Sequence, residues 1–245
     1  QYHEYFYDSE LSKLRACETY QTNLKGRRSH IWKSYIEWIE GRCYRYMSKP
    51  EELKVLDIGS RNVGWVDELR QSSILSDLSL LNCLPPIKSD IETSHDEESQ
   101  FDVLLALNVI QREIDPQSFL KKLHNKLKDD GVMILSFRSG VGFDVLALKE
   151  NNKSIFPLDH LFLPSLDGIK IILEKSGFMI QEMITPGQLD AEIVKNAVEK
   201  GECTDPLIVH LVETVSVEEL QTFIQKNNLS SHVRIVAKKS KGISS

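Results

Sequence analysis

Hydrophobic residues along this chain follow two alternating patterns. Short continuous apolar runs, typical of strands covered on both faces of a parallel sheet, occupy residues 53–58, 101–107 and 132–137. Stretches with helical spacing of three and four residues alternate with them, and the first has apolar positions at Trp32, Tyr35, Ile36, Ile39, Cys43 and Tyr46. Strands that alternate with helices favour crossover connections and a parallel sheet.

The ends of several predicted helices carry their own signals. Asp115-Pro116 is a favourable start for a helix that Asp130-Gly131 is expected to end. Ser165 begins another helix, and Ser216 forms a capping box with Glu219. Further helices are expected at 65–71 and 189–199, and further strands at 73–76, 88–91, 178–184 and 232–237.

Length and composition set the domain organisation. The chain has 245 residues, of which 41% are apolar and 27% charged, an ordinary balance for a globular protein with one sizeable core. We expect a helical cap over residues 1–50 and one α/β domain over 51–240. An insertion near 185–230 interrupts that domain, and a frayed tail is expected at 241–245.

The net charge limits the kinds of partner that this protein is expected to bind. Thirty Lys and Arg face 36 Asp and Glu, giving a formal charge of -6, so nucleic acid is a poor first expectation. No apolar run approaches the roughly 18 residues that span a bilayer, and no signal peptide is visible, so a cytoplasmic protein is expected. The four cysteines (17, 43, 83 and 203) are too scattered for a disulfide framework or a metal site.

Three acidic residues are predicted at the carboxyl ends of strands, where ligands bind in open parallel sheets. They are Asp57, Asp77 and Asp90, and Asp77 follows Asp57 by 20 residues, a spacing suited to an acid that binds ribose hydroxyls. The turn after the first strand keeps two glycines, Gly59 and Gly64. Such a turn is a weak motif by itself, because helix packing alone accounts for two glycines about equally well.

The whole succession of segments is more specific than the turn. Residues 55–59, Asp77, 88–91, 100–103, 108–110 and 127–135 follow one another in an order that resembles the class I S-adenosylmethionine-dependent methyltransferases. The resemblance implies a doubly wound, Rossmann-like α/β fold with a seven-stranded, mostly parallel sheet and an antiparallel last strand. It also implies S-adenosyl-L-methionine as the cofactor.

Carried over by position, the resemblance assigns the cofactor site. Asp57, Gly59, Ser60 and Gly64 would surround the methionine part. Asp77 with the adjoining Leu78 would bind the ribose, Asp90 and Ile91 the adenine, and Leu107 and Asn108 would lie near the sulfonium. The sequence departs from the family at Arg61, where a second glycine is more usual.

His160, within residues 156–164, is the candidate catalytic base, because similar Pro-x-x-His-aromatic stretches face the acceptor pocket in many members of this family. Its imidazole suits proton abstraction near neutral pH, although a structural loop histidine is an equally good interpretation. Residues 138–140 are a second candidate for the acceptor side, with a structural turn as the alternative.

We expect methyl transfer to a small molecule, with a sugar or other polyhydroxylated metabolite as the leading acceptor. A non-catalytic scaffolding domain and a protein-modifying enzyme remain alternatives.

Overall fold

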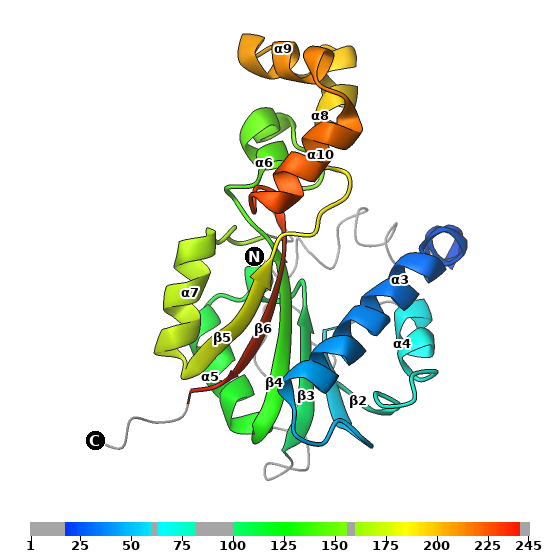
Figure 1. Cartoon of the computed structure of the whole chain (residues 1–245), viewed down its shortest axis with the longest axis vertical. Coiled ribbons are helices and arrows are strands. Elements are labelled where there is room, and N and C mark those ends of the chain that lie inside the picture. Colours follow the sequence, from blue (N-terminus) through cyan, green and yellow to red (C-terminus); the bar gives the residue numbers. More distant parts are fainter. Residues whose placement is uncertain (1–17, 60–62, 82–99, 156–159, 241–245) are drawn as a thin grey trace.

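Six strands form a single sheet in the described part of the chain (Figure 1). The computed structural model describes residues 18–59, 63–81, 100–155 and 160–240. The strands lie in the order β2-β1-β3-β4-β6-β5 across the sheet. Their bounds are Lys54–Ile58 for β1, Asp77–Leu81 for β2, Phe101–Leu107 for β3, Leu127–Arg138 for β4, Phe178–Ile184 for β5 and His232–Lys239 for β6.

The last strand reverses direction. β1 pairs in parallel with β2 and β3, and β3 with β4, whereas β6 runs antiparallel between β4 and β5. β1 to β5 therefore end at one edge of the sheet, and β6 begins there. The antiparallel last strand is confirmed, but the described residues form six strands rather than the seven expected. The strand predicted at 88–91 lies outside them.

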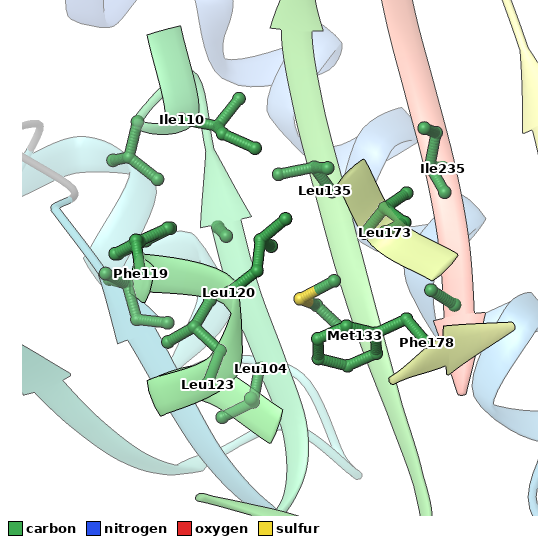
Figure 2. Close-up of a cluster of buried hydrophobic side chains, with 14 of the residues drawn as sticks. Leu104, Ile110, Phe119, Leu120, Leu123, Met133, Leu135, Leu173, Phe178 and Ile235 are labelled. Carbon is green, nitrogen blue, oxygen red and sulfur yellow. The ribbon is translucent and has the colours of Figure 1, made fainter. Parts of the chain in front are cut away.

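Helices cover both faces of the sheet. On one face, α3 (Glu18–Tyr46) and α4 (Val63–Leu69) pack residues such as Ile39 and Leu69 against the strands. On the other face are α5 (Pro116–Lys126) and α7 (Leu166–Lys175). Figure 2 shows Leu120 and Leu123 of α5 and Leu173 of α7 in the apolar cluster over this face. Each fully buried side chain of this kind stabilises the fold by about 1.5–3 kcal/mol.

Four further helices stack beyond one end of the sheet, at the top of Figure 1. α6 (Phe143–Leu148) follows β4, and the segment between β5 and β6 forms α8 (Asp190–Glu199), α9 (Pro206–Thr214) and α10 (Val217–Lys226). Their apolar faces make a separate cluster that includes Val194 and Ile224. No helix in the described ranges is long and apolar enough to cross a membrane.

Most predicted elements are confirmed, including the N-cap bond from the Ser118 amide to Asp115 and the capping box at Ser216. Sequence patterns missed α6 and α9, and they ended α5 too late, because β4 already begins at Leu127. The tail at 241–245 lies outside the described residues.

The strand predicted at 73–76 is wrong. The Ser72 hydroxyl accepts the amides of Ile74 (3.3 Å) and Leu75 (3.0 Å), which closes a turn there. β2 begins only at Asp77 as a result.

Candidate functional site

Two residues with left-handed backbone lie where neighbouring strands end. Gly59, directly after β1, has φ +76°, and its amide donates to the Leu81 carbonyl at the end of β2 (2.8 Å). Asn108, directly after β3, has φ +56° and donates its amide to the Ser136 carbonyl of β4 (2.9 Å). Glycine and asparagine are the residues that adopt this backbone most readily. The carboxyl ends of β1 and β3 therefore turn sharply away from the sheet side by side.

Asp57, near the end of β1, stabilises the turn that follows this strand. Its side chain is buried, and its Oδ2 accepts a hydrogen bond from the Trp65 indole Nε1 at 2.8 Å. The indole belongs to α4, so this bond fixes the helix that follows the glycine turn. The Trp65 ring also packs on Tyr35 of α3, with ring centroids 5.6 Å apart.

The segment that begins at His160 crosses the same edge of the sheet. The Leu161 amide donates to the Gln111 carbonyl (2.8 Å), within the 3₁₀ turn η2 (Ile110–Arg112) that follows β3. At its other end, Pro164 accepts the amide of Gly140, just beyond β4 (3.3 Å). The segment 160–164 therefore joins the residues that follow β3 to those that follow β4, and half-buried His160 lies at its start.

Arg138, at the end of β4, connects the sheet to the helices beyond it. Its guanidinium donates to Asp144 Oδ2 of α6 (3.0 Å) and to the Ser231 hydroxyl (2.7 Å). Its own amide donates to Gln111 Oε1 (3.0 Å). Asp144 is fully buried and also accepts from Asn152 (3.2 Å). Residues 138–140 are a candidate for the acceptor side, with a structural turn as the alternative, and the structure pairs Arg138 with an aspartate that the sequence analysis did not single out.

A second buried carboxylate fastens the insertion. Asp190 at the start of α8 accepts from the Ser230 hydroxyl (2.8 Å) and the Ser231 amide (3.2 Å), and Gln221 of α10 donates to it at 3.0 Å. A Cβ built on Gly187 would lie 1.9 Å from the Ser230 oxygen, so a larger residue would displace the Ser230 hydroxyl from Asp190. The helices between β5 and β6 are thus bonded directly to the residues that precede β6.

Glu113 is a buried acid at this edge that sequence reasoning missed. It directly follows η2, and its Oε1 has no hydrogen-bond partner in the described structure. Burial raises its pKa to about 8, although the charge of Lys122 acts in the opposite direction. An acid shortly after an apolar strand was the available signal, but nothing in the sequence showed that the side chain would be buried.

An aromatic and cationic cluster lies under α3. The Arg234 guanidinium of β6 is 3.7 Å from the ring centroid of Tyr35 and 5.3 Å from that of Trp38. Arg42 is 4.7 Å from the same Trp38 ring and forms an ion pair with Glu182 of β5 (2.7 Å). The available signal was an arginine within the apolar strand at 232–237. Trp32 and Tyr35 pack against the core, as their helical spacing predicted, and Trp38 packs beside them.

The structure brings part of the predicted cofactor site together. Asp57, Gly59, Leu107 and Asn108 lie at the carboxyl ends of β1 and β3, and Gly64 is buried in α4. No cluster of three or more metal-ligating side chains occurs among the described residues. Four residues of the predicted site and its turn fall outside the described ranges: Ser60, Arg61, Asp90 and Ile91.

Asp77 and Leu78 require a correction. They pair with Lys54 and Val55 at the beginning of β1, so they lie at the amino edge of the sheet, opposite the Gly59 turn. The cause is the turn at Ser72, which delays the start of β2. Asp77 therefore does not lie at the edge of the sheet where the ribose was expected to bind.

Comparisons with known proteins agree with this architecture. A family model described as a methyltransferase domain matches residues 29–183, more than half of the chain. A tRNA U34 carboxymethyltransferase from Campylobacter lari is 27% identical over 179 residues, which are 66% of this chain and 60% of that protein. The chain thus spans less than two thirds of the length of this curated relative.

Solved structures show the same fold. The plantazolicin methyltransferase BpumL in complex with SAH has a TM-score of 0.56 and 12% identity, covering 98% of this chain and 94% of its own. A chain in the complex between the Haloferax volcanii Trm112 methyltransferase activator and a methyltransferase has a TM-score of 0.55 and 13% identity, covering 93% and 96%. Because the family model covers the sheet from α3 through most of β5, the chain belongs to the class I methyltransferase family, whose cofactor is S-adenosylmethionine.

Proposed function

We propose that this protein transfers a methyl group from S-adenosylmethionine to a small-molecule acceptor. The observation that carries the proposal is the pair of left-handed turns at Gly59 and Asn108, which open the carboxyl ends of β1 and β3 side by side within the region matched by the family. Ligands of open α/β sheets bind at this edge. Gly59 permits close approach of the main chain to a ligand, and this cofactor carries no phosphate that would require a longer glycine-rich loop.

When bound, S-adenosylmethionine supplies an electrophilic methyl group for an in-line displacement. The protein must then align the acceptor and, for a hydroxyl acceptor, remove its proton. Asp57 and Trp65 hold the turn that would carry the methionine part, and Leu107 and Asn108 would line the site near the sulfonium. His160, at the start of the segment bonded to the residues after β3 and β4, is the side chain we assign to proton removal.

The relatives give the sugar acceptor expected from the sequence no support. The curated relative is named for action on tRNA, but a chain with a formal charge of -6 is a poor match for a phosphate backbone. We therefore propose a small-molecule acceptor without naming a sugar.

Calorimetric titration with S-adenosylmethionine tests the cofactor site. Gly59→Ala places a side chain at φ +76° against the proposed ligand, and we expect it to abolish or strongly weaken binding. The matched control is Gly201→Ala, because Gly201 has φ +71° and open space around it at the end of α8. Both variants carry similar backbone strain, so equal losses of affinity, or no binding by the wild type, would contradict the proposal.

His160→Ala tests the assigned base. We expect cofactor affinity near that of the wild type and turnover lowered by about 10²–10⁴-fold, the usual effect of a positioned base. His210→Ala on α9, an exposed histidine outside the site, is the control. Turnover within a few-fold of the wild type would make His160 a structural residue. Cofactor binding without turnover on any acceptor in a broad panel would favour the scaffolding alternative.

A further inference from the structure

The Arg234 side chain is a cation without a counter-ion in the described structure. Its two neighbouring arginines are both neutralised, Arg42 by Glu182 (2.7 Å) and Arg138 by Asp144 (3.0 Å). Among the described residues, no carboxylate lies within ion-pair distance of Arg234. A half-buried guanidinium in this state has lost part of its hydration without gaining an opposite charge.

Within the described ranges, Arg234 makes one side-chain hydrogen bond, which leaves most of its guanidinium fork available there. Its Nε donates to His232 Nε2 at 3.4 Å. Burial, together with the charges of Arg234 and Arg138, lowers the pKa of His232 to about 4, so its ring is a neutral acceptor near pH 7. The terminal nitrogens of the guanidinium remain for another partner.

Buried polar atoms with few partners lie on the same face of the sheet. Trp38 Nε1 has no hydrogen-bond partner in the described structure, and the hydroxyls of Tyr35 and Ser136 have only each other there. The Tyr35 and Trp38 rings contact Arg234 directly. Ser136 pairs with Arg234 across the β4–β6 ladder, so their side chains lie on one face.

The chemistry of these atoms limits what can satisfy them. An indole N–H and a guanidinium only donate hydrogen bonds, and burial raises the pKa of Tyr35, so its hydroxyl remains protonated and able to donate. A group that accepts several hydrogen bonds and carries negative charge meets these requirements. Orphaned buried donors are rare in proteins and commonly mark a place for a ligand or an ordered water.

We propose that Arg234, with Tyr35, Trp38 and Ser136, binds a carboxylate group of the methyl acceptor. This inference rests on the proposed methyltransferase function. A carboxylate fits the planar guanidinium fork, and its single negative charge balances the positive charge of the Arg234 guanidinium.

The position of Arg234 suits an acceptor rather than the cofactor. β6 is two strands away from β3, at whose end Asn108 lies, so at the strand spacing of a sheet the carboxylate would bind about 10 Å from the transfer site. Gly59, beside which the cofactor's own carboxylate would bind, is one strand further away. Tyr35, Trp38 and Arg234 are all half-buried, so the cluster reaches the protein surface.

Intrinsic tryptophan fluorescence can test this site, because Trp38 is part of it. We would titrate the protein with acetate and with acetamide, a neutral molecule of the same shape. We expect a saturable change with acetate alone, and an affinity for acetate that is lower by about tenfold to a hundredfold in Arg234→Gln. Arg45→Gln, which removes an exposed arginine stacked on Tyr46 of the same helix, should leave acetate binding unchanged.

Two further arms keep the test decisive. Tyr35→Phe removes only a hydroxyl whose one partner in the described structure is the Ser136 hydroxyl, so it should fold even where Arg234→Gln does not, and it should weaken acetate binding several-fold. If inorganic phosphate binds more tightly than acetate, the cluster is a site for a phosphate group, and the carboxylate assignment is overturned. Displacement of acetate by S-adenosylhomocysteine would mean that the cluster binds the carboxylate of the cofactor, which also overturns it.

Failure of this inference differs from failure of the proposed function. Acetate that binds no better than acetamide would show that the orphaned atoms are satisfied by water, while calorimetry with S-adenosylmethionine would still test the function. Conversely, acetate binding in a protein that binds no S-adenosylmethionine would keep the anion site but remove its role in methyl transfer.

Discussion

Glu113 should make this protein less stable as the pH rises through neutrality. Burial raises the pKa of its carboxyl to about 8, against an ordinary value of 4.5. Between these two pH values the folded chain holds a proton that the unfolded chain has released. Stability from this residue is therefore fully present below pH 4.5 and is lost as the pH rises toward 8. At about 1.4 kcal/mol per pH unit, roughly 3 kcal/mol is lost by pH 7.

Urea denaturation of the wild type and of Glu113→Gln measures this loss. Glutamine keeps the shape and stays neutral, so the variant should gain about 3 kcal/mol relative to the wild type between pH 4.5 and pH 7. Histidines with lowered pKa values, such as His124 and His232, titrate equally in both proteins, so they cancel in the difference. Glu213→Gln, an exposed residue of α9, is the control. A difference between Glu113→Gln and the wild type that does not change with pH would refute the reasoning.

Substitution of two glycines by alanine should change the free energy of unfolding in opposite directions. A Cβ on Gly142 would lie 2.2 Å from the Ser231 Cα, so Gly142→Ala should lower the free energy of unfolding by about 3 kcal/mol or loosen the insertion, measurable by urea denaturation and by hydrogen exchange in α8. Gly41 lies within α3 with nothing within 4 Å of its added Cβ, and Gly41→Ala should raise the free energy of unfolding by about 0.5–1 kcal/mol. A neutral Gly142→Ala or a destabilised Gly41→Ala would contradict these packing arguments.

Local patterns predicted the elements whose signals are local. The run at 101–107 forms β3, and Asp115 caps α5 through the Ser118 amide, because both depend on residues that are neighbours in sequence. The error at 73–76 has the same origin: four residues of mixed polarity gave little evidence for a strand, and the Ser72 hydroxyl favours a turn there.

The site was predictable only where it depends on strand ends. Gly59 and Asn108 follow apolar runs directly, so the sheet brings them together without further information. The contacts of Arg234 depend instead on the antiparallel register of β6 against β4 and on the docking of α3, which joins Tyr35 to a residue far along the chain. No spacing in the sequence encodes that contact.

Arg138 links the candidate site to the insertion. Its amide donates to the Gln111 side chain, and the Gln111 main-chain carbonyl accepts the amide of Leu161, next to His160. Its guanidinium donates to Asp144 of α6 and to the Ser231 hydroxyl before β6. A movement of the helices beyond the sheet would therefore disturb the end of β4 and the His160 segment together. Because Asp144 is fully buried, separating it from Arg138 would leave a buried charge without its cation, and such a change costs about 3–5 kcal/mol. The helices between β5 and β6 are thus fastened beside the carboxyl edge of the sheet, where the acceptor would bind under the proposed function.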